Sequence, residues 1–216
     1  MKVKICGVCR AADAAVVSEA GADFIGVILA PGSRRTLSLE TARDVFGSAG
    51  RVSRVGVFAD ASFDAIVHAV SHLGLDVVQL HGSEPPEDVT RLRRVASVWK
   101  AVRVRTPAEL AWAAATYPMA DALLLDAWHP TQAGGTGTAL DWNALVADRD
   151  RLPDAMTMVL AGGLNPDNVA VAARILRPHV VDVSSGVETA PGIKSVEKIQ
   201  AFIAAARSAH ASQKES

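Results

Sequence analysis

The chain has 216 residues, a formal net charge of −1, 50% apolar residues and only 5% aromatic residues. This near-neutral, aromatic-poor composition excludes a basic or stacking surface for nucleic acid and an electrostatic surface for anionic membranes. We expect a protein of the reducing cytoplasm, because the first residues form no signal-peptide core, no apolar run reaches the roughly 20 residues of a membrane span, and two cysteines build no disulfide framework.

Eight short and almost wholly apolar runs follow one another along the chain, each typical of a strand that is buried on both faces. We expect these strands to start near residues 3, 24, 53, 77, 98, 122, 156 and 180. The stretches between them, such as 11–20 and 64–73, place apolar residues at helical spacing. Strands that alternate with helices predict a parallel sheet, and eight such units close naturally into a single (β/α)8 barrel, a TIM barrel with outer helices.

An open, doubly wound α/β sheet is the alternative, although the first strand lacks the G-x-G-x-x-G sequence typical of that fold. No Pro/Ser-rich linker or shift in composition divides the chain, so we expect one catalytic barrel domain over residues 1–206. Residues 207–216 are polar, and we expect them to form a frayed C-terminal tail. No long exposed apolar face is evident, so we expect a monomer.

Chemistry in such a barrel takes place where the strands end. Cys6 follows the first predicted strand, His81 the fourth and Asp126 the sixth. A carboxylate at this position either caps a turn or acts as a general acid, and a thiol is either a buried apolar group or a reactive one. Lys4 alternates with apolar residues, so we expect it to point into the barrel, where its ammonium needs an acid such as Asp182.

The loops after the seventh and eighth strands favour phosphate binding. Gly162-Gly163 and Ser184-Ser185-Gly186 offer backbone N–H groups and hydroxyls, and Asn165 is a candidate helix N-cap. Ordinary turns also favour these residue types, so the alternative is a pair of structural turns.

The longest loop connects the sixth and seventh strands and contains Gly134-Gly135-Thr136-Gly137, which is either a lid over the substrate or a slack surface loop. Arg34 and Arg35 follow the second strand, and either guanidinium could bind a carboxylate in a bidentate manner. Cys6 and Cys9 have the spacing of a redox pair or of half a zinc site, but the histidines do not cluster, so we expect no metal.

The segment Lys4–Arg10, KICGVCR, resembles the opening K-I-C-G-[apolar]-T-R of the phosphoribosylanthranilate isomerase family. The resemblance continues in order through residues 26–38, 55–58, 78–82, 125–126, 134–137, 161–166, 182–188 and 191–194, and so covers the whole chain. Cys9 stands where the family has Thr, and Arg34 where it has Pro. This family pattern favours Arg35 over Arg34 as the inward-facing arginine.

The resemblance implies an Amadori rearrangement of N-(5'-phosphoribosyl)anthranilate to 1-(2-carboxyphenylamino)-1-deoxyribulose 5-phosphate in tryptophan biosynthesis. It implies that Asp126 is the general acid and Cys6 the general base. Arg35 would bind the anthranilate carboxylate, His81 and Asp182 would be further substrate-binding residues, and the loops after the last two strands would hold the phosphate. No metal or organic cofactor is implied, and the only expected partner is a small phosphoribosyl substrate.

Three other functions stay open at this point. A related isomerase of histidine biosynthesis has the same fold, but its chemistry is expected to use two carboxylates, whereas the first strand here ends in Cys6. A thiol redox protein would use Cys6 and Cys9 together. A barrel that binds a phosphorylated ligand without transforming it would need only the phosphate loops.

Overall fold

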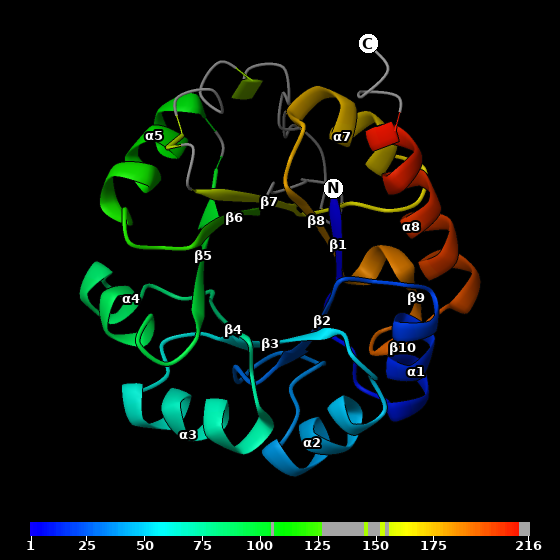
Figure 1. Cartoon of the computed structure of the whole chain (residues 1–216), viewed down its shortest axis with the longest axis horizontal. Coiled ribbons are helices and arrows are strands. Elements are labelled where there is room, and N and C mark those ends of the chain that lie inside the picture. The colour runs from blue at the N-terminus through cyan, green and yellow to red at the C-terminus, as the bar shows by residue number, and fades with distance from the viewer. Residues whose placement is uncertain (105, 127–144, 147–151, 154–155, 212–216) are drawn as a thin grey trace.

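The computed structural model describes residues 1–104, 106–126, 145–146, 152–153 and 156–211. Eight parallel strands form a closed barrel in which each strand pairs with its neighbours in the sequence and β1 pairs with β8 (Figure 1). The strands are β1 (Lys2–Ile5), β2 (Phe24–Ile28), β3 (Ser53–Phe58), β4 (Val77–Leu80), β5 (Ser97–Arg103), β6 (Ala122–Asp126), β7 (Thr157–Ala161) and β8 (Val180–Val183).

Helices surround the barrel on the outside (Figure 1). They are α1 (Ala11–Glu19), α2 (Leu39–Gly47), α3 (Phe63–Leu73), α4 (Pro86–Leu92), α5 (Pro107–Thr116), α7 (Val169–Leu176) and α8 (Val196–Ala211). Local sequence sets several of their ends. Ser38 and Ser62 cap α2 and α3 by accepting a hydrogen bond from a first-turn backbone N–H. Gly74 ends α3 in the left-handed conformation, with φ of 61°.

The predicted barrel is confirmed, and the eight observed strands start within one residue of the predicted positions. Helix α8 extends to Ala211, so residues 207–211, which we expected in a frayed tail, belong to a helix. Their alanine-rich sequence lets the helix continue despite its polar residues. Residues 212–216 lie outside the described part of the chain.

The core has two apolar layers, because side chains alternate between the two faces of each strand. Outward-facing residues such as Ile5 and Leu123 pack against the helices. Inward-facing residues such as Phe24, Trp99 and Leu124 fill the barrel. Lys4 also faces inward and is fully buried.

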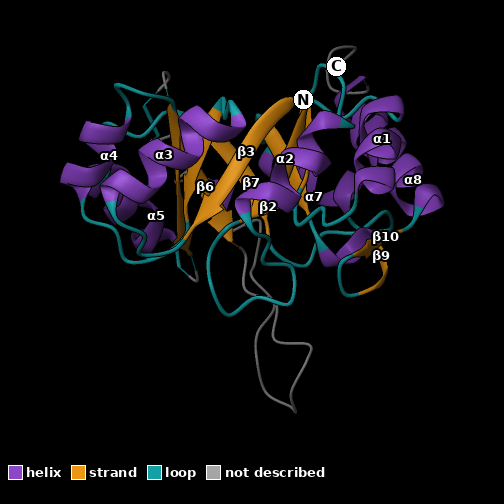
Figure 2. Cartoon of the chain, turned by 90° about the horizontal axis from the view of Figure 1, so that it is seen from below, coloured by secondary structure: helices purple, strands orange, loops and turns teal. Residues whose placement is uncertain are grey.

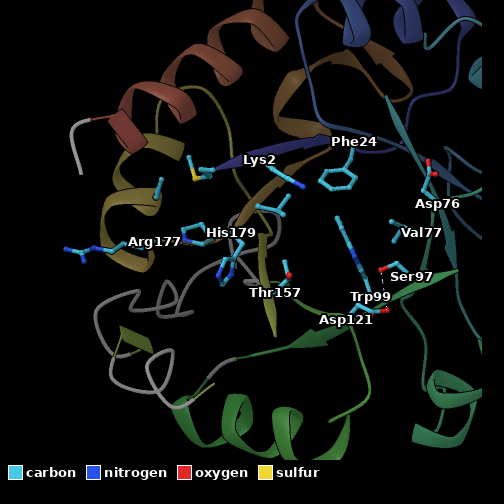
Figure 3. Close-up of a pocket in the computed structure, with 14 residues that line it drawn as sticks. Lys2, Phe24, Asp76, Val77, Ser97, Trp99, Asp121, Thr157, Arg177 and His179 are labelled. Carbon is cyan, nitrogen blue, oxygen red and sulfur yellow. Dashed lines mark hydrogen bonds between the residues drawn. The ribbon is translucent and has the colours of Figure 1, made fainter. Parts of the chain in front are cut away.

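At the N-terminal end of the barrel, the same type of side-chain-to-backbone hydrogen bond recurs at alternate strands. The residue before each even-numbered strand accepts a hydrogen bond from a backbone N–H of the preceding strand. The acceptors are Asp23 for β1, Asp76 for β3, Asp121 for β5 and His179 for β7, with donor–acceptor distances of 2.7–2.9 Å. A cavity of about 820 Å³ opens at this end above Phe24 and Trp99 (Figure 3). Because Asp76, Asp121 and His179 at its rim already serve the strand ends, we assign this end to stability.

The C-terminal end carries a feature that the sequence did not predict. After β8 the chain forms a single 3₁₀ turn, η1 (Ser185–Val187), and then a small antiparallel hairpin of β9 (Glu188–Ala190) and β10 (Ile193–Lys194). The hairpin lies at the end of the barrel opposite to the start of β1 (Figure 2). In the described part of the chain, no helix combines the length and apolar character needed to cross a membrane.

Candidate active site

A cavity of about 280 Å³ opens at the C-terminal ends of the strands and brings together most of the predicted site residues. Eight of those residues line it: Cys6, His81, Asp126, Gly162, Gly163, Asp182, Ser184 and Ser185. Their strands are spread around the barrel, so a ligand in the cavity would be contacted from several sides at once. This convergence at the strand ends is where barrel enzymes carry their chemistry.

Two predicted residues lie outside the lining of this cavity. Gly186 sits beneath the loops, where a Cβ atom would overlap the backbone carbonyl oxygen of Leu164. Its lack of a side chain therefore allows the loop after β8 to pack against the loop after β7. Arg35 lies in a neighbouring cleft that shares Ser185 with the cavity. The predicted lid residues Gly134, Gly135, Thr136 and Gly137 lie outside the described residues.

The loop after β7 has the backbone conformation that its glycines permit. Gly162 and Gly163 have φ values of 83° and 65°, which favour glycine strongly. The side chain of Asn165 accepts hydrogen bonds from the backbone N–H groups of Asp167 and Asn168, at 2.8 and 3.1 Å. Asn165 thus caps the turn, while α7 itself begins later, after Asn168, than we predicted.

The loop after β8 adds a buried hydroxyl. Within the described residues, Ser184 Oγ is buried without a hydrogen-bond partner. A Cβ atom on Gly7 would come within 2.8 Å of this hydroxyl oxygen, so the glycine after β1 leaves room for it. An unpaired buried hydroxyl is unfavourable unless a ligand or water satisfies it. Ser184 is therefore suited to bind a polar ligand group.

The predicted pairing of Lys4 inside the barrel is confirmed. Its ammonium lies 2.8 Å from Asp182 Oδ2 and donates a 2.9 Å hydrogen bond to Gln79 Oε1. Burial alone would lower the pKa of Lys4, but the Asp182 carboxylate and the neighbouring Cys6 outweigh it and raise that pKa. The other carboxylate oxygen, Asp182 Oδ1, is buried with no partner among the described residues. Asp182 therefore pairs with Lys4 through one oxygen, and its other oxygen could accept from a ligand.

Cys6 follows β1 directly as a buried thiol that is 7% exposed. Burial raises its pKa, and the Asp182 carboxylate acts in the same direction, while the Lys4 and Lys194 ammonium groups lower it. The balance keeps the pKa of Cys6 above the ordinary range of a thiol. The site supplies cations that favour a thiolate, but they only partly offset the burial.

Asp126 ends β6 on another side of the cavity. Its Oδ2 lies 3.5 Å from His81 Nε2, and both side chains are about one third exposed. The other ring nitrogen of His81, Nδ1, lies 3.0 Å from the amide nitrogen of Gln79. The candidate acid is thus connected through His81 and Gln79 to the buried ammonium of Lys4.

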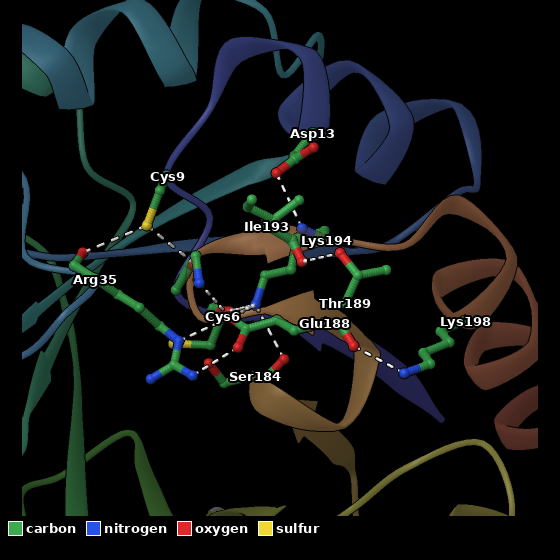
Figure 4. Close-up of polar contacts among 12 residues, drawn as sticks. Cys6, Cys9, Asp13, Arg35, Ser184, Glu188, Thr189, Ile193, Lys194 and Lys198 are labelled. Atoms are coloured by element: carbon green, nitrogen blue, oxygen red, sulfur yellow. Dashed lines mark hydrogen bonds and ion pairs between the residues drawn. The ribbon is translucent and has the colours of Figure 1, made fainter.

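Arg35 is held at the cavity edge by a buried carboxylate (Figure 4). Its Nε and Nη2 donate to the two oxygens of Glu188 at 2.7 and 2.6 Å. Lys194 approaches the same carboxylate at 3.0 Å and also donates to the backbone carbonyl oxygens of Cys6 and Ser184. The ends of β1 and β8 and the β9–β10 hairpin are thereby fastened together.

Arg34, in contrast to Arg35, is exposed. Arg35 is partly buried against Glu188, and both arginines line the neighbouring cleft.

Cys9, unlike Cys6, lies outside the lining of the cavity. Both are free thiols, and Cys9 donates to the backbone carbonyl oxygens of Gly7 and Arg35 (Figure 4). Burial raises the pKa of Cys9 as it does that of Cys6, so neither thiol has the depressed pKa that is typical of a reactive redox thiol. Within the described ranges, no group of three His, Cys, Asp or Glu side chains could hold a metal ion.

Three contributors to the site were not predicted from the sequence as functional residues. The only sequence signal for Gln79 is that it is a polar residue in an apolar strand. Glu188 and Lys194 appeared only within segments that resemble the family, residues 182–188 and 191–194. Their importance follows from side-chain contacts across the barrel.

Comparison with known proteins gives a consistent result. A model of the N-(5'-phosphoribosyl)anthranilate isomerase family matches residues 3–205. A curated protein of that name from Rubrobacter xylanophilus is 43% identical over 209 residues, which cover 96% of this chain and 99% of the relative. The crystal structure of phosphoribosyl anthranilate isomerase from Thermotoga maritima is similar with a TM-score of 0.87 and 39% identity, covering 96% and 99% of the two chains.

A second solved structure bears on the ligand. It is a phosphoribosyl anthranilate isomerase in complex with reduced 1-(o-carboxyphenylamino)-1-deoxyribulose 5-phosphate, with a TM-score of 0.85 and 37% identity, covering 96% of this chain and 99% of that one. Its likeness, the family model and the curated relatives all extend over nearly the entire barrel. The chain belongs to the N-(5'-phosphoribosyl)anthranilate isomerase family.

Proposed function

We propose that this chain isomerises N-(5'-phosphoribosyl)anthranilate to 1-(2-carboxyphenylamino)-1-deoxyribulose 5-phosphate. One observation carries the proposal beyond family membership. A thiol directly after β1 and a carboxyl at the end of β6 line a single cavity. The loops after β7 and β8 line the same cavity, and one of them holds a hydroxyl that has no hydrogen-bond partner among the described residues. An acid and a base on different sides of one sugar are what the rearrangement requires.

Asp126 is the general acid in this proposal. It donates its proton to the furanose ring oxygen while the bond from that oxygen to C1 breaks, which leaves a protonated Schiff base between C1 and the anthranilate nitrogen. The Cys6 thiolate then takes the proton from C2. The electrons of that C–H bond move toward the nitrogen and form the enolamine.

The enolamine becomes the product when it gains a proton at C1 and loses the proton of the 2-hydroxyl, which leaves a ketone at C2. At this point Cys6 carries a proton and Asp126 has lost one, so each returns to its starting form by proton exchange with solvent. The imine itself accepts the electrons, so the residues need only move protons and orient the substrate.

Binding at both ends of the substrate would supply that orientation. The backbone around Gly162 and Gly163 and the hydroxyls of Ser184 and Ser185 would hold the phosphate. Arg35 would hold the anthranilate carboxylate with the guanidinium nitrogen that points away from Glu188 (Figure 4). Orientation of this kind contributes roughly 7–11 kcal/mol at the extreme. Asp182 Oδ1, which has no partner in the part of the chain that the structure describes, would accept from a sugar hydroxyl.

The decay of phosphoribosylanthranilate fluorescence tests the function. Purified chain is expected to remove the fluorescence in a time course proportional to its concentration. Inorganic phosphate is expected to inhibit competitively, because it would occupy the loops after β7 and β8. No turnover by folded wild-type chain would overturn the function, and indifference to phosphate would overturn the assignment of those loops.

A further inference from the structure

A chain of polar contacts joins Lys4 to Asp126 across the barrel. Lys4 on β1 donates to Gln79 Oε1 on β4 at 2.9 Å. The Gln79 amide nitrogen lies 3.0 Å from His81 Nδ1, and His81 Nε2 lies 3.5 Å from Asp126 Oδ2. Its last member is the proposed general acid.

Lys4 fixes which groups along this chain donate and which accept. An ammonium group only donates, so the Gln79 oxygen must face Lys4 and the Gln79 nitrogen must face His81. That amide nitrogen also only donates, so His81 Nδ1 must accept. A neutral imidazole with an accepting Nδ1 carries its proton on Nε2. His81 therefore presents an N–H group to Asp126.

Burial keeps the Gln79 amide from flipping between Lys4 and His81. Lys4 is 0% exposed and Gln79 is 2% exposed, so neither can exchange its partner for bulk water. The Asp182 carboxylate, 2.8 Å from the ammonium, holds Lys4 in place. A flipped Gln79 amide would direct its N–H group at the ammonium and leave two buried donors unpaired, which is unfavourable.

We propose that Lys4 and Gln79 are positioning residues that fix His81 as its Nε2–H tautomer, and that this tautomer orients Asp126. The inference rests on the proposed function only for the role of Asp126 as the acid. When Asp126 is protonated, an N–H group at Oδ2 favours the proton on Oδ1. The chain thus selects which carboxyl oxygen delivers the proton.

The substitution Gln79→Glu tests the inference with almost no change in shape. It replaces the donor that faces His81 by a carboxylate oxygen, which accepts, so the proton of His81 is expected to move to Nδ1. Nitrogen-15 NMR of the imidazole rings distinguishes the two states, and the difference spectrum of His81→Gln assigns His81 among the six histidines. The wild-type chain is expected to show an unprotonated Nδ1.

We expect kcat to fall by about tenfold or more, which is less than the roughly hundredfold or greater loss for removing a general acid, because Asp126 stays present but is displaced. KM is expected to change little, because the phosphate loops and Arg35 are untouched. Gln200→Glu is the matched control, since it is the same substitution on the exposed surface of α8 and is expected to change neither signal nor rate.

Each outcome is decisive. A protonated Nδ1 in neutral wild-type His81, or an unprotonated Nδ1 in Gln79→Glu, would overturn the inference whatever the activity. A moved proton with unchanged kcat would overturn the link to Asp126. If Gln79→Glu does not fold, Gln79→Met removes both polar atoms, and a mixture of His81 tautomers is expected instead of one. Absence of wild-type turnover would count against the proposed function alone, since the NMR signal needs no turnover.

Discussion

Replacing Glu188 with Gln tests the electrostatic support of the cavity edge. The Glu188 carboxylate lies between two cations, with Arg35 Nη2 at 2.6 Å and Lys194 Nζ at 3.0 Å. The Glu188 side chain is 6% exposed and that of Lys194 is 1% exposed. The substitution Glu188→Gln would keep the shape of the side chain, remove its negative charge and leave the two cations facing a neutral amide.

The expected loss of stability follows from this burial. Breaking a buried ion pair by removing one partner destabilises a protein by about 3–5 kcal/mol. Arg35 is 22% exposed, so water can compensate part of its charge. We therefore expect the lower end, about 3 kcal/mol, which is roughly a hundredfold increase in the unfolded fraction. KM is also expected to rise, because Arg35 loses the group that holds its guanidinium.

Equilibrium urea unfolding, followed by circular dichroism, measures this loss of free energy of unfolding. Glu19→Gln is the matched control, because Glu19 is exposed at the end of α1 and its substitution is expected to change stability by less than about 0.5 kcal/mol. A loss below about 1 kcal/mol in Glu188→Gln would refute the reasoning, since it lies in the range of surface ion pairs.

Three further predictions concern the buried carboxylates, the loop after β8 and the buried Lys4. Burial alone would raise the pKa values of Glu84 and Glu188. A hydrogen bond from Lys100 outweighs this effect at Glu84, and hydrogen bonds from Arg35 and Lys194 outweigh it at Glu188, so both pKa values lie below the usual range. Their contribution to the free energy of unfolding is therefore present above about pH 4.3, the ordinary pKa of Glu in the unfolded chain, and is lost as the pH falls through the lower pKa values of the folded state. Midpoints of urea unfolding that stay constant down to about pH 3 would exclude this contribution. Gly186→Ala is expected to lower the melting temperature and raise KM, because its Cβ overlaps a carbonyl of the loop after β7; an unchanged melting curve and KM would argue against this packing. Lys4→Met removes a cation that lowers the pKa of Cys6, so the rise of kcat/KM with pH is expected to move to higher pH, and an unmoved profile would contradict the role of that cation.

The strands of this barrel could be predicted because they are buried on both faces. An apolar run such as Leu123–Leu125 is uninterrupted, and it stops where a polar residue, Asp126, meets the barrel mouth. The same logic placed Cys6 and His81 at one end. Strand direction alone brings such residues together, so no knowledge of side-chain packing is needed.

The partners of those residues could not be predicted in the same way. Arg35 and Glu188 are 153 positions apart, and their pairing depends on a hairpin of five strand residues that lacks a strong pattern. Gln79 could be seen as a polar residue in β4, but its role depends on which amide atom faces Lys4. Lys4 was the exception, because a lone charge inside an apolar barrel requires a buried acid and Asp182 was the available candidate.

The proposed reaction depends most on Cys6 as the base and Asp126 as the acid. The most direct measurement is the turnover of phosphoribosylanthranilate by the wild-type chain and by Cys6→Ser and Asp126→Asn, with competitive inhibition by inorganic phosphate as the control for an intact site. We expect each variant to lose about a hundredfold or more in kcat while its inhibition constant for phosphate stays unchanged. Turnover at the wild-type rate by either variant would contradict the assigned roles.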